Sequence, residues 1–309
     1  MAGRLSFLSR HANRPVRRAR RYVEAARACP ADIGDRRPRP SPAPSAARHV
    51  RKRIRRRGWI RRVRPFGMRV THSATMKGQP PMFPQVLTDG YRSFLGERLP
   101  NERRKYEMLG KEGQEPEVLL IGCCDSRVAP EVIFNTGPGQ IFTIRNVANI
   151  VPPSQPDGAY HGTSSAIEFA VQALKVKHIV VLGHATCGGI KAAGFGAEPL
   201  SSGNFIGSWV SLVQPATKKL AEAGDSKDKE GYLTRLEYTM IGQSLENLMT
   251  FDFIREAVEA GKLHLHGAHF GIETGELRIR NPNTGEFESV VSRDGQSLAA
   301  SALIGCTAA

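Results

Sequence analysis

Apolar runs of strand length recur along the chain, and segments of helical character separate them. EVLLIG (117–122) and HIVVLGH (178–184) are nearly continuous apolar runs, typical of strands covered on both faces, and QIFTIRNVAN (140–149) predicts a further strand. KLHLHGAHFGI (262–272) predicts another. ELRIRNPNTGEFESV (276–290) predicts an edge hairpin, because a Pro/Asn/Gly turn divides it.

Helices are predicted between these strands. TSSAIEFAVQAL has helical apolar spacing, and Ser165 with Glu168 fits a capping box at its start. Longer helices are expected over about 205–222 and 232–260, with Gly261 as the C-terminal stop of the second. Short strands alternating with helices predict an α/β fold, a mainly parallel β-sheet flanked by helices.

The positive charge of the chain is concentrated at its N-terminus. The formal net charge is +15, but residues 1–75 hold 22 of the 44 Lys and Arg against 3 of the 29 Asp and Glu, which leaves 22 bases and 26 acids elsewhere. The Arg/Pro-rich composition of residues 1–75 predicts a disordered basic tail. Residues 76–309 are then expected to form a single α/β domain that begins with a helical arm (82–110).

Three interpretations of the tail compete: an arm for nucleic acid or an anionic surface, an organellar presequence, and upstream coding in an arginine-biased genome. We favour the last, with the working protein starting near Met76 or Met82, because no aromatic residues are paired with bases for recognition. A cytoplasmic location is therefore expected, or an organellar one if the tail is a presequence. No nucleic-acid partner is expected except through the tail, and no membrane partner is expected because no apolar run reaches the ~18 residues of a span.

Thiols and charges gather directly after two of the predicted strands. CCDSR supplies Cys123, Cys124, Asp125 and Arg127 after one strand, and HATCGG follows another. In parallel sheets, sites form at the carboxyl ends of strands, so both clusters lie where chemistry is expected. The five cysteines form no disulfide framework, which indicates thiols kept reduced for metal binding or reaction.

Two thiolates and an imidazole from these clusters, Cys123, His184 and Cys187, suit zinc and leave one coordination position free, as in catalytic sites. Only one of Cys123 and Cys124 can normally face the ion, and the spacing alone does not choose between them. A single H-x-x-C pair is more often a packing feature than a ligand pair, so the case depends on both clusters together. The rival cluster His264, His266 and His269 is interpreted as an ordinary half-buried strand.

Asp125 and Arg127 have the spacing of a charge-assisted ion pair, which would keep the aspartate ionised and fix its direction. Beside a metal, such a carboxylate could orient a bound water. The simpler interpretation is a turn salt bridge, worth about 0–1 kcal/mol if exposed.

CCDSRVAPEVIF, PGQIFTIRNVAN and VVLGHATCGGIKAA together resemble the β-class carbonic anhydrases, and the resemblance covers roughly residues 82 to 290. The family implies a zinc enzyme that reversibly hydrates carbon dioxide to bicarbonate and a proton, using hydroxide formed on one Zn²⁺ per subunit. It also implies a parallel sheet flanked by helices and a homodimer, alone or as a dimer of dimers.

The resemblance also assigns roles to individual residues. The zinc ligands would be Cys123, His184 and Cys187, and the pair that gates the metal would be Asp125 and Arg127. The residues at substrate-contacting positions are Gln114, contributed across the dimer, Phe142, Val147, Phe169 and Gly188.

Two other functions are consistent with the same motifs. The first is hydrolysis of carbonyl sulfide or carbon disulfide on the same fold, which the motifs cannot separate from hydration of carbon dioxide. The second, of a different class, is a zinc-stabilised binding protein whose arginine tail holds RNA or an acidic partner. In that protein Asp125→Asn would change nothing measurable, whereas in an enzyme it would abolish activity and leave the fold intact.

Overall fold

The computed structural model describes residues 83–196 and 203–291. The chain divides into two compact units, Met1–Asn101 and Glu102–Ala309, and each is considered by itself. The predicted tail, residues 1–75, lies outside the described residues, so its disorder stays a prediction.

The described part of the first unit is helical, as predicted for the arm. It contains α2 (Gln85–Ser93), the π-helix η1 (Phe94–Arg98) and the beginning of α3 (Leu99–Glu112), which continues into the second unit. None of the residues of these three helices is buried.

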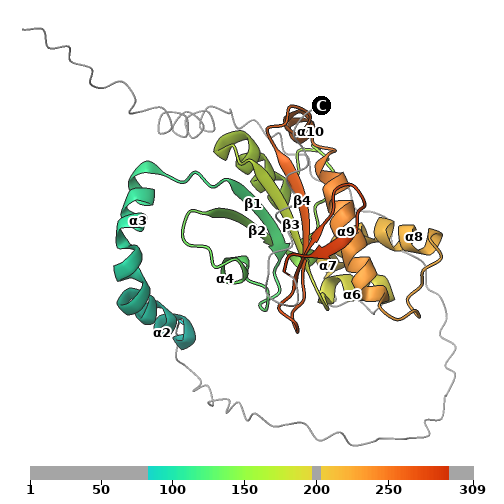
Figure 1. The fold of residues 1–309 in the computed structure, drawn as a ribbon, viewed down its shortest axis with the longest axis horizontal. Helices are drawn as coiled ribbons and strands as arrows, with labels where there is room; N and C mark the ends of the chain where they lie inside the picture. The colour runs from blue at the N-terminus through green and yellow to red at the C-terminus, as the bar shows by residue number, and fades with distance from the viewer. Residues whose placement is uncertain (1–82, 197–202, 292–309) are drawn as a thin grey trace, which may run out of the picture. The chain divides into compact units, whose positions relative to one another are not determined.

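The second unit is built on a six-stranded sheet of order β2-β1-β3-β4-β5-β6 (Figure 1). The strands are β1 (Val118–Cys123), β2 (Ile141–Asn146), β3 (His178–His184), β4 (His264–Phe270), β5 (Leu277–Arg280) and β6 (Phe287–Ser289). The first four strands pair in parallel, and β5 and β6 form an antiparallel hairpin at the edge. The predicted α/β fold, a mainly parallel sheet flanked by helices, is confirmed.

The helices of the second unit connect and cover these strands. They are α4 (Pro130–Ile133), η2 (Val147–Asn149), α5 (Gly162–Glu168), the π-helix η3 (Phe169–Leu174), α6 (Gly188–Phe195), α7 (Asn204–Val210), η4 (Ser211–Val213), α8 (Gln214–Glu222), α9 (Tyr232–Leu248) and α10 (Asp252–Glu259). Within the described ranges no helix combines the length and apolar character that crossing a membrane requires.

Both long helices predicted from the sequence are interrupted. The helix predicted at 205–222 is interrupted by the 3-10 helix η4, after which α8 begins. Pro215 lies in the first turn of α8, where proline is favoured because its missing N–H is not needed. The segment predicted at 232–260 breaks at Phe251, whose backbone is extended (φ −84°, ψ 117°) while its ring is buried in the core. Burial of this ring accompanies the change of direction between α9 and α10.

The helix ends confirm one prediction and contradict another. The prediction of a capping box at Ser165 is wrong, because α5 begins at Gly162 and Ser165 lies inside its first turn. There the Ser165 hydroxyl donates to the carbonyl of His161 (2.9 Å). The stop at Gly261 is confirmed: its φ is +65°, and its N–H and that of Lys262 donate to the carbonyls of the last helical turn, as in a Schellman motif.

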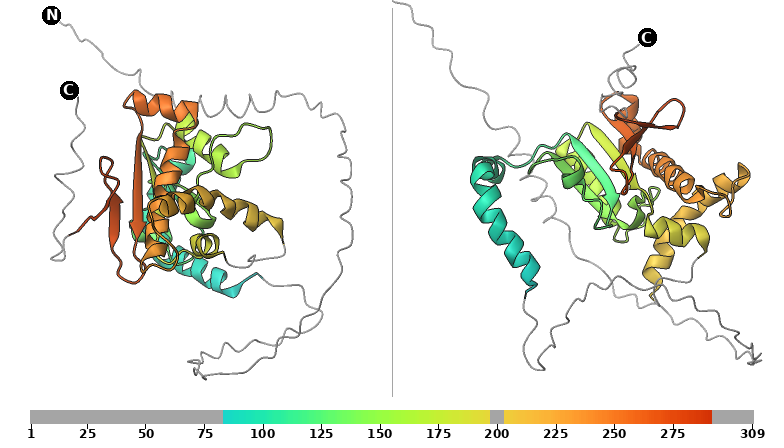
Figure 2. Two further views of the ribbon diagram at one scale, coloured as in Figure 1. Left: turned by 90° about the vertical axis from the view of Figure 1, so that its right-hand side faces the viewer. Right: turned by 60° about the horizontal axis from the view of Figure 1, so that its bottom comes forward.

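The hydrophobic core lies mainly on one face of the sheet. Alternate residues of the central strands point to this face and pack against α5, η3, α9 and α10: Leu119, Ile121, Ile179 and Val181 of the sheet, and Ile167, Ile241, Leu248 and Ile254 of the helices. The opposite face carries a smaller cluster around Leu120, Leu182 and Ala268, with side chains from α4 and its end. Figure 2 shows α9 lying against the sheet from two further directions.

The topology places a switch point between β1 and β3. The chain passes from β1 to β2 on one side and then returns to β3 on the other side of β1. A crevice outside the carboxyl ends of two such strands is where open α/β sheets bind ligands. Cys123 ends β1 and His184 ends β3, so the predicted donors lie at this point.

Candidate metal centre

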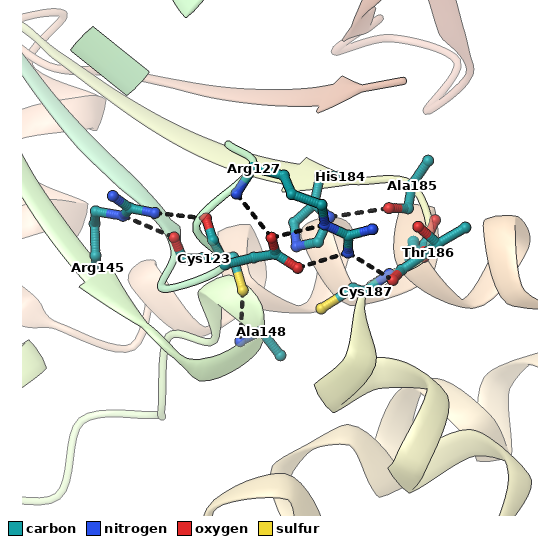
Figure 3. Close-up of polar contacts among 10 residues, drawn as sticks. Cys123, Arg127, Arg145, Ala148, His184, Ala185, Thr186 and Cys187 are labelled. Carbon is teal, nitrogen blue, oxygen red and sulfur yellow. Dashed lines mark hydrogen bonds and ion pairs between the residues drawn. The ribbon is translucent and has the colours of Figure 1, made fainter. Parts of the chain in front are cut away.

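The three predicted metal donors converge at the carboxyl ends of β1 and β3. Cys123 ends β1, His184 ends β3, and Cys187 immediately precedes α6. All three are buried, and their ligand atoms lie within 4.8 Å of one another (Figure 3). This group could hold a metal ion, and no other group of three or more His, Cys, Asp or Glu in the described residues has such geometry.

The imidazole of His184 has one ring nitrogen satisfied and the other free. Nδ1 lies 3.0 Å from the carbonyl oxygen of Ala185, which can only accept, so Nδ1 carries the proton. Nε2 is therefore left with a lone pair. It is one of two buried side-chain polar atoms without a hydrogen-bond partner in the described part of the chain. A buried, unpartnered acceptor beside two thiols fits a metal ligand.

The two thiols share a polar environment. The hydrogen bond with Cys187 lowers the pKa of Cys123 to about 4, and the N–H of Ala148 also reaches the Cys123 Sγ at 3.4 Å. The same contact between the thiols, together with burial, raises the pKa of Cys187. A divalent cation bound here would displace the thiol protons, since metal-bound cysteines are thiolates.

Two non-glycine residues near the thiols adopt left-handed backbone conformations. Ala148, whose N–H reaches the Cys123 Sγ, has φ +66°, and Thr186 has φ +57° immediately before Cys187. Such conformations are unfavourable for residues with a Cβ and are uncommon for β-branched residues. A Cβ on Gly189 would lie 2.9 Å from Val147 Cγ1, so a glycine here allows α6 to approach the turn after β2.

Asp125 and Arg127 form the predicted pair in bidentate geometry. Arg127 Nε donates to Asp125 Oδ1 at 2.9 Å and Nη2 donates to Oδ2 at 2.7 Å, while the backbone N–H of Arg127 also reaches Oδ1. The guanidinium holds the pKa of Asp125 far below its usual range. Arg127 also donates to the carbonyl of Thr186 (3.4 Å), which connects the pair to the turn that carries Cys187.

Arg145 is a site residue that the sequence did not indicate. From β2, its Nε donates to the carbonyl of Cys123 (2.8 Å) and its Nη2 to the carbonyl of Asp125 (2.7 Å). It therefore fixes the backbone of the turn that presents both the thiol and the carboxylate. The only sequence signal was a charged residue within a predicted buried strand.

The predicted substrate residues fall into two groups. Val147 and Gly188 adjoin the metal donors, and a Cβ on the exposed Gly188 would meet no atom within 4 Å. Phe142 and Phe169 contact each other, with ring centroids 5.9 Å apart, but Phe142 pairs with Leu119, four residues before Cys123 on β1. Gln114 is exposed in the loop before β1, at the opposite end of that strand from the metal donors.

The alternative donors lie outside the centre. Cys124 is exposed, whereas Cys123 is buried, so the structure distinguishes the two adjacent thiols. His264 and His266 gather around His178 on one face of the sheet, and His269 is buried on the other face. None of these three predicted strand histidines belongs to the group that could hold a metal, in line with their interpretation as structural.

Comparison with known proteins places this geometry in a family. The family model described as "Carbonic anhydrase" matches residues 118–277, which include all three donors and the Asp125–Arg127 pair. The chain belongs to the β-carbonic anhydrase family.

Individual relatives agree with this assignment. Over 159 residues the chain is 36% identical to beta carbonic anhydrase 5, chloroplastic, of Arabidopsis thaliana, and the match covers 52% of each protein, about half the length of that curated relative. The structure of the β-carbonic anhydrase CcaA is 29% identical with a TM-score of 0.62, covering 66% of this chain and 98% of that one. A tetrameric β-carbonic anhydrase of Sordaria macrospora is 31% identical with a TM-score of 0.55, covering 63% and 95%.

Proposed function

We propose that this protein catalyses the reversible hydration of carbon dioxide to bicarbonate and a proton, with one zinc ion per subunit held by Cys123, His184 and Cys187. The observation that carries the proposal is the free, buried Nε2 of His184 among two thiols, beside a bidentate Asp125–Arg127 pair. Membership of the β-carbonic anhydrase family supports the same conclusion.

Zinc is the metal that fits these donors best. Two sulfurs and one imidazole nitrogen are suitable for its four-coordinate sites, and three protein donors leave one position for a water or substrate. When bound there, zinc supplies a Lewis acid that makes water a nucleophile near neutral pH.

Asp125 is the group that would orient the reacting water. Arg127 binds both of its oxygens and keeps the carboxylate ionised; Oδ1 accepts two hydrogen bonds from Arg127, whereas Oδ2 accepts one and retains a lone pair for a further hydrogen bond. Arg127 thereby also holds the carboxylate away from the free coordination position. The main-chain N–H groups near Gly188, which has open space above it, would receive the substrate oxygens.

A second copy of the chain would complete the site. Gln114, Phe142 and Phe169 lie away from the donors of their own chain, and Phe169 is 41% exposed. The arm has an exposed apolar set that suits an interface: Phe83, Val86, Leu87, Tyr91 and Leu95. We therefore propose a homodimer, alone or as a dimer of dimers, in which these residues line the partner's pocket.

Stopped-flow measurement of carbon dioxide hydration by the full, zinc-loaded chain tests the proposal. The expected result is turnover far above the uncatalysed rate, which is lost in Cys123→Ser together with the zinc. Parallel assays with carbonyl sulfide separate hydration from sulfur-analogue hydrolysis. Zinc-loaded protein that hydrates no carbon dioxide would contradict the proposal.

A further inference from the structure

A buried acid–base pair lies behind the metal donors and has no part in the proposed reaction. Glu237 of α9 and His269 of β4 are each 3% exposed, and they are two of the five buried polar residues in the described part of the second unit. Burial of ionisable groups is costly unless they are paired and hydrogen-bonded. The groups that hydrogen-bond to this pair therefore indicate what the pair stabilises.

The carboxylate of Glu237 connects the pair to a predicted metal ligand. Its Oε1 accepts the backbone N–H of Cys187 at 2.9 Å, and its Oε2 lies 3.0 Å from His269 Nε2, so that one proton lies between them. The ring of His269 is packed edge-on against Tyr238, with centroids 4.8 Å apart. Each oxygen of Glu237 thus has one defined partner.

The peptide group that Glu237 binds is held at both ends. The N–H of Cys187 and the carbonyl of Thr186 belong to the same peptide bond, and that carbonyl accepts from Arg127 (3.4 Å). Thr186 has the left-handed φ of +57° that a β-branched residue adopts only when its surroundings impose it. A continuous chain of contacts therefore runs from His269 through Glu237 and this peptide to the Asp125–Arg127 pair.

Glycines allow α9 to approach closely enough for this contact. A Cβ on Gly183 of β3 or on Gly267 of β4 would lie 2.7 or 2.8 Å from side-chain atoms of Ile241, one turn beyond Glu237. A Cβ on Gly194 of α6 would likewise lie 2.3 Å from a side-chain atom of Leu236. Helix α9 thus packs directly against β3, β4 and α6, which brings the Glu237 carboxylate to the backbone N–H of Cys187.

We propose that Glu237, oriented by His269, is a positioning residue for the metal centre. It fixes the Thr186–Cys187 peptide, and through it both the Cys187 thiol and the guanidinium of Arg127. The inference rests on the metal-binding part of the proposed function and is independent of which substrate is hydrated.

Zinc affinity and the spectrum of the Co²⁺-substituted full chain test this role. Glu237→Met removes both hydrogen bonds at similar volume, and we expect it to raise the dissociation constant for zinc about 10- to 100-fold and to alter the Co²⁺ absorption bands. Glu237→Gln keeps an oxygen for the Cys187 N–H and an amide for His269 in its other tautomer. It is expected to keep near-wild-type zinc affinity and spectrum.

Ser244→Ala is the matched control. Ser244 is fully buried on the same helix two turns later and accepts the N–H of Val151 (3.2 Å), without contacting a metal donor. It is expected to lower thermal stability while leaving zinc affinity unchanged. If Glu237→Met does not fold, His269→Phe, which removes only the outer contact, is expected to weaken zinc binding.

Folded Glu237→Met or His269→Phe protein with wild-type zinc affinity and Co²⁺ spectrum would overturn the inference. Equal weakening in Ser244→Ala would also overturn it, because the role would then be general support of α9. Zinc binding is measured without substrate. If the wild type proves inactive but the variants change zinc affinity as expected, only the proposed reaction is contradicted, and the role of Glu237 stands.

Discussion

At the scale of single residues, the turns after β1 and β3 are held by side chains that bind backbone atoms. Arg145 binds the carbonyls of Cys123 and Asp125, and Glu237 and Arg127 bind the two ends of one peptide. The backbone that carries the candidate donors is therefore held by contacts with side chains outside the donor group. Substitution of Arg145 or Glu237, which bind this backbone, should therefore disturb the site although neither residue is a candidate donor.

Arg145→Met should lower the free energy of unfolding by about 1–3 kcal/mol, because it leaves two part-buried carbonyls without their charged donor. Urea denaturation measures the change. Arg255→Met, which breaks only an exposed pair with Asp252, should stay within about 0.5 kcal/mol of the wild type. Equal effects of the two substitutions would contradict the role assigned to Arg145.

Asp125→Asn should leave the fold and most of the zinc in place but lower kcat about 100-fold or more, because the neutral amide loses the bidentate ion pair with Arg127 and no longer orients the water as the carboxylate does. Stopped-flow assays and zinc analysis of the same preparation measure both quantities. Cys124→Ser, one residue away and exposed, should keep full activity. Turnover at the wild-type rate in Asp125→Asn would contradict the role assigned to Asp125, whereas the absence of turnover in both proteins would favour a zinc-stabilised binding protein.

The donor chemistry was predictable from residue type and position, but the choice of Cys123 over Cys124 depended on the family resemblance. Cys123, His184 and Cys187 follow strands whose apolar runs are unmistakable, and the Asp125–Arg127 spacing predicts an ion pair. The supporting contacts were not predictable in this way. Glu237 lies fifty residues from Cys187, and its partner is a backbone N–H that every residue type offers.

At the scale of elements, the buried strands carried a clear signal and the helix boundaries did not. Runs such as EVLLIG give β1 almost directly, because both faces of a central parallel strand are covered. The breaks at η4 and before α10 depend on how Pro215 and Phe251 fit the finished core. The capping box failed because the Ser165 hydroxyl instead bonds back to His161.

Lys175 ends η3 in the left-handed conformation (φ +60°, ψ 42°) and is exposed. Lys175→Gly should raise the free energy of unfolding by up to about 1 kcal/mol, because glycine adopts this conformation without the penalty of a Cβ. Lys175→Ala retains the Cβ and should give no such gain. Denaturant unfolding of the two variants compares them directly, and an equal response would argue against strain at this position.

The histidine cluster of β3 and β4 should make stability depend on pH. Burial and then the neighbouring His264 lower the pKa of His178, and burial and then His178 lower the pKa of His266. In the unfolded chain these histidines have their ordinary pKa of about 6.5, so between that pH and the lower folded pKa values the unfolded chain binds more protons than the folded one. The free energy of unfolding therefore decreases as the pH falls from about 6.5 to the folded pKa values.

Urea denaturation between pH 7.5 and 5 tests this dependence. His178→Gln should flatten the curve, because it removes one of the two groups and the 3.1 Å contact of His178 Nδ1 with His266 Nε2. Glu117 and Lys177, which also face His178, act in opposite directions on its pKa. An unchanged slope in the variant would rule out the cluster as the source.

At the scale of the whole molecule, the fold follows from the alternation of strands and helices, whereas the complete site requires, in our proposal, a second copy of the chain. The metal donors meet at the switch point between β1 and β3, whereas Gln114 and the Phe142–Phe169 pair lie towards the other end of the strands. An apolar pattern shows that a face is covered, but it cannot specify whether the cover is the same chain or another copy.

The exposed apolar side chains of α2 offer a test of assembly. Leu87 and Tyr91 are 55% and 60% exposed and lie one turn apart. The double substitution Leu87→Asp/Tyr91→Asp should convert the proposed dimer to monomers and lower activity strongly, as measured by light scattering and stopped-flow assay. Gln85→Asp, at an exposed polar position of the same helix, should change neither. A fully active monomer would contradict the shared site.

Zinc K-edge X-ray absorption of the purified full-length protein tests the central claim most directly. Coordination by two sulfur atoms and one imidazole nitrogen of the chain, with a fourth light-atom ligand from solvent and one zinc per subunit, is the predicted result. In Cys187→Ser zinc binding should weaken, and the zinc that remains bound should have one sulfur ligand. Protein that binds no zinc, or a shell closed by four protein side chains, would contradict the account.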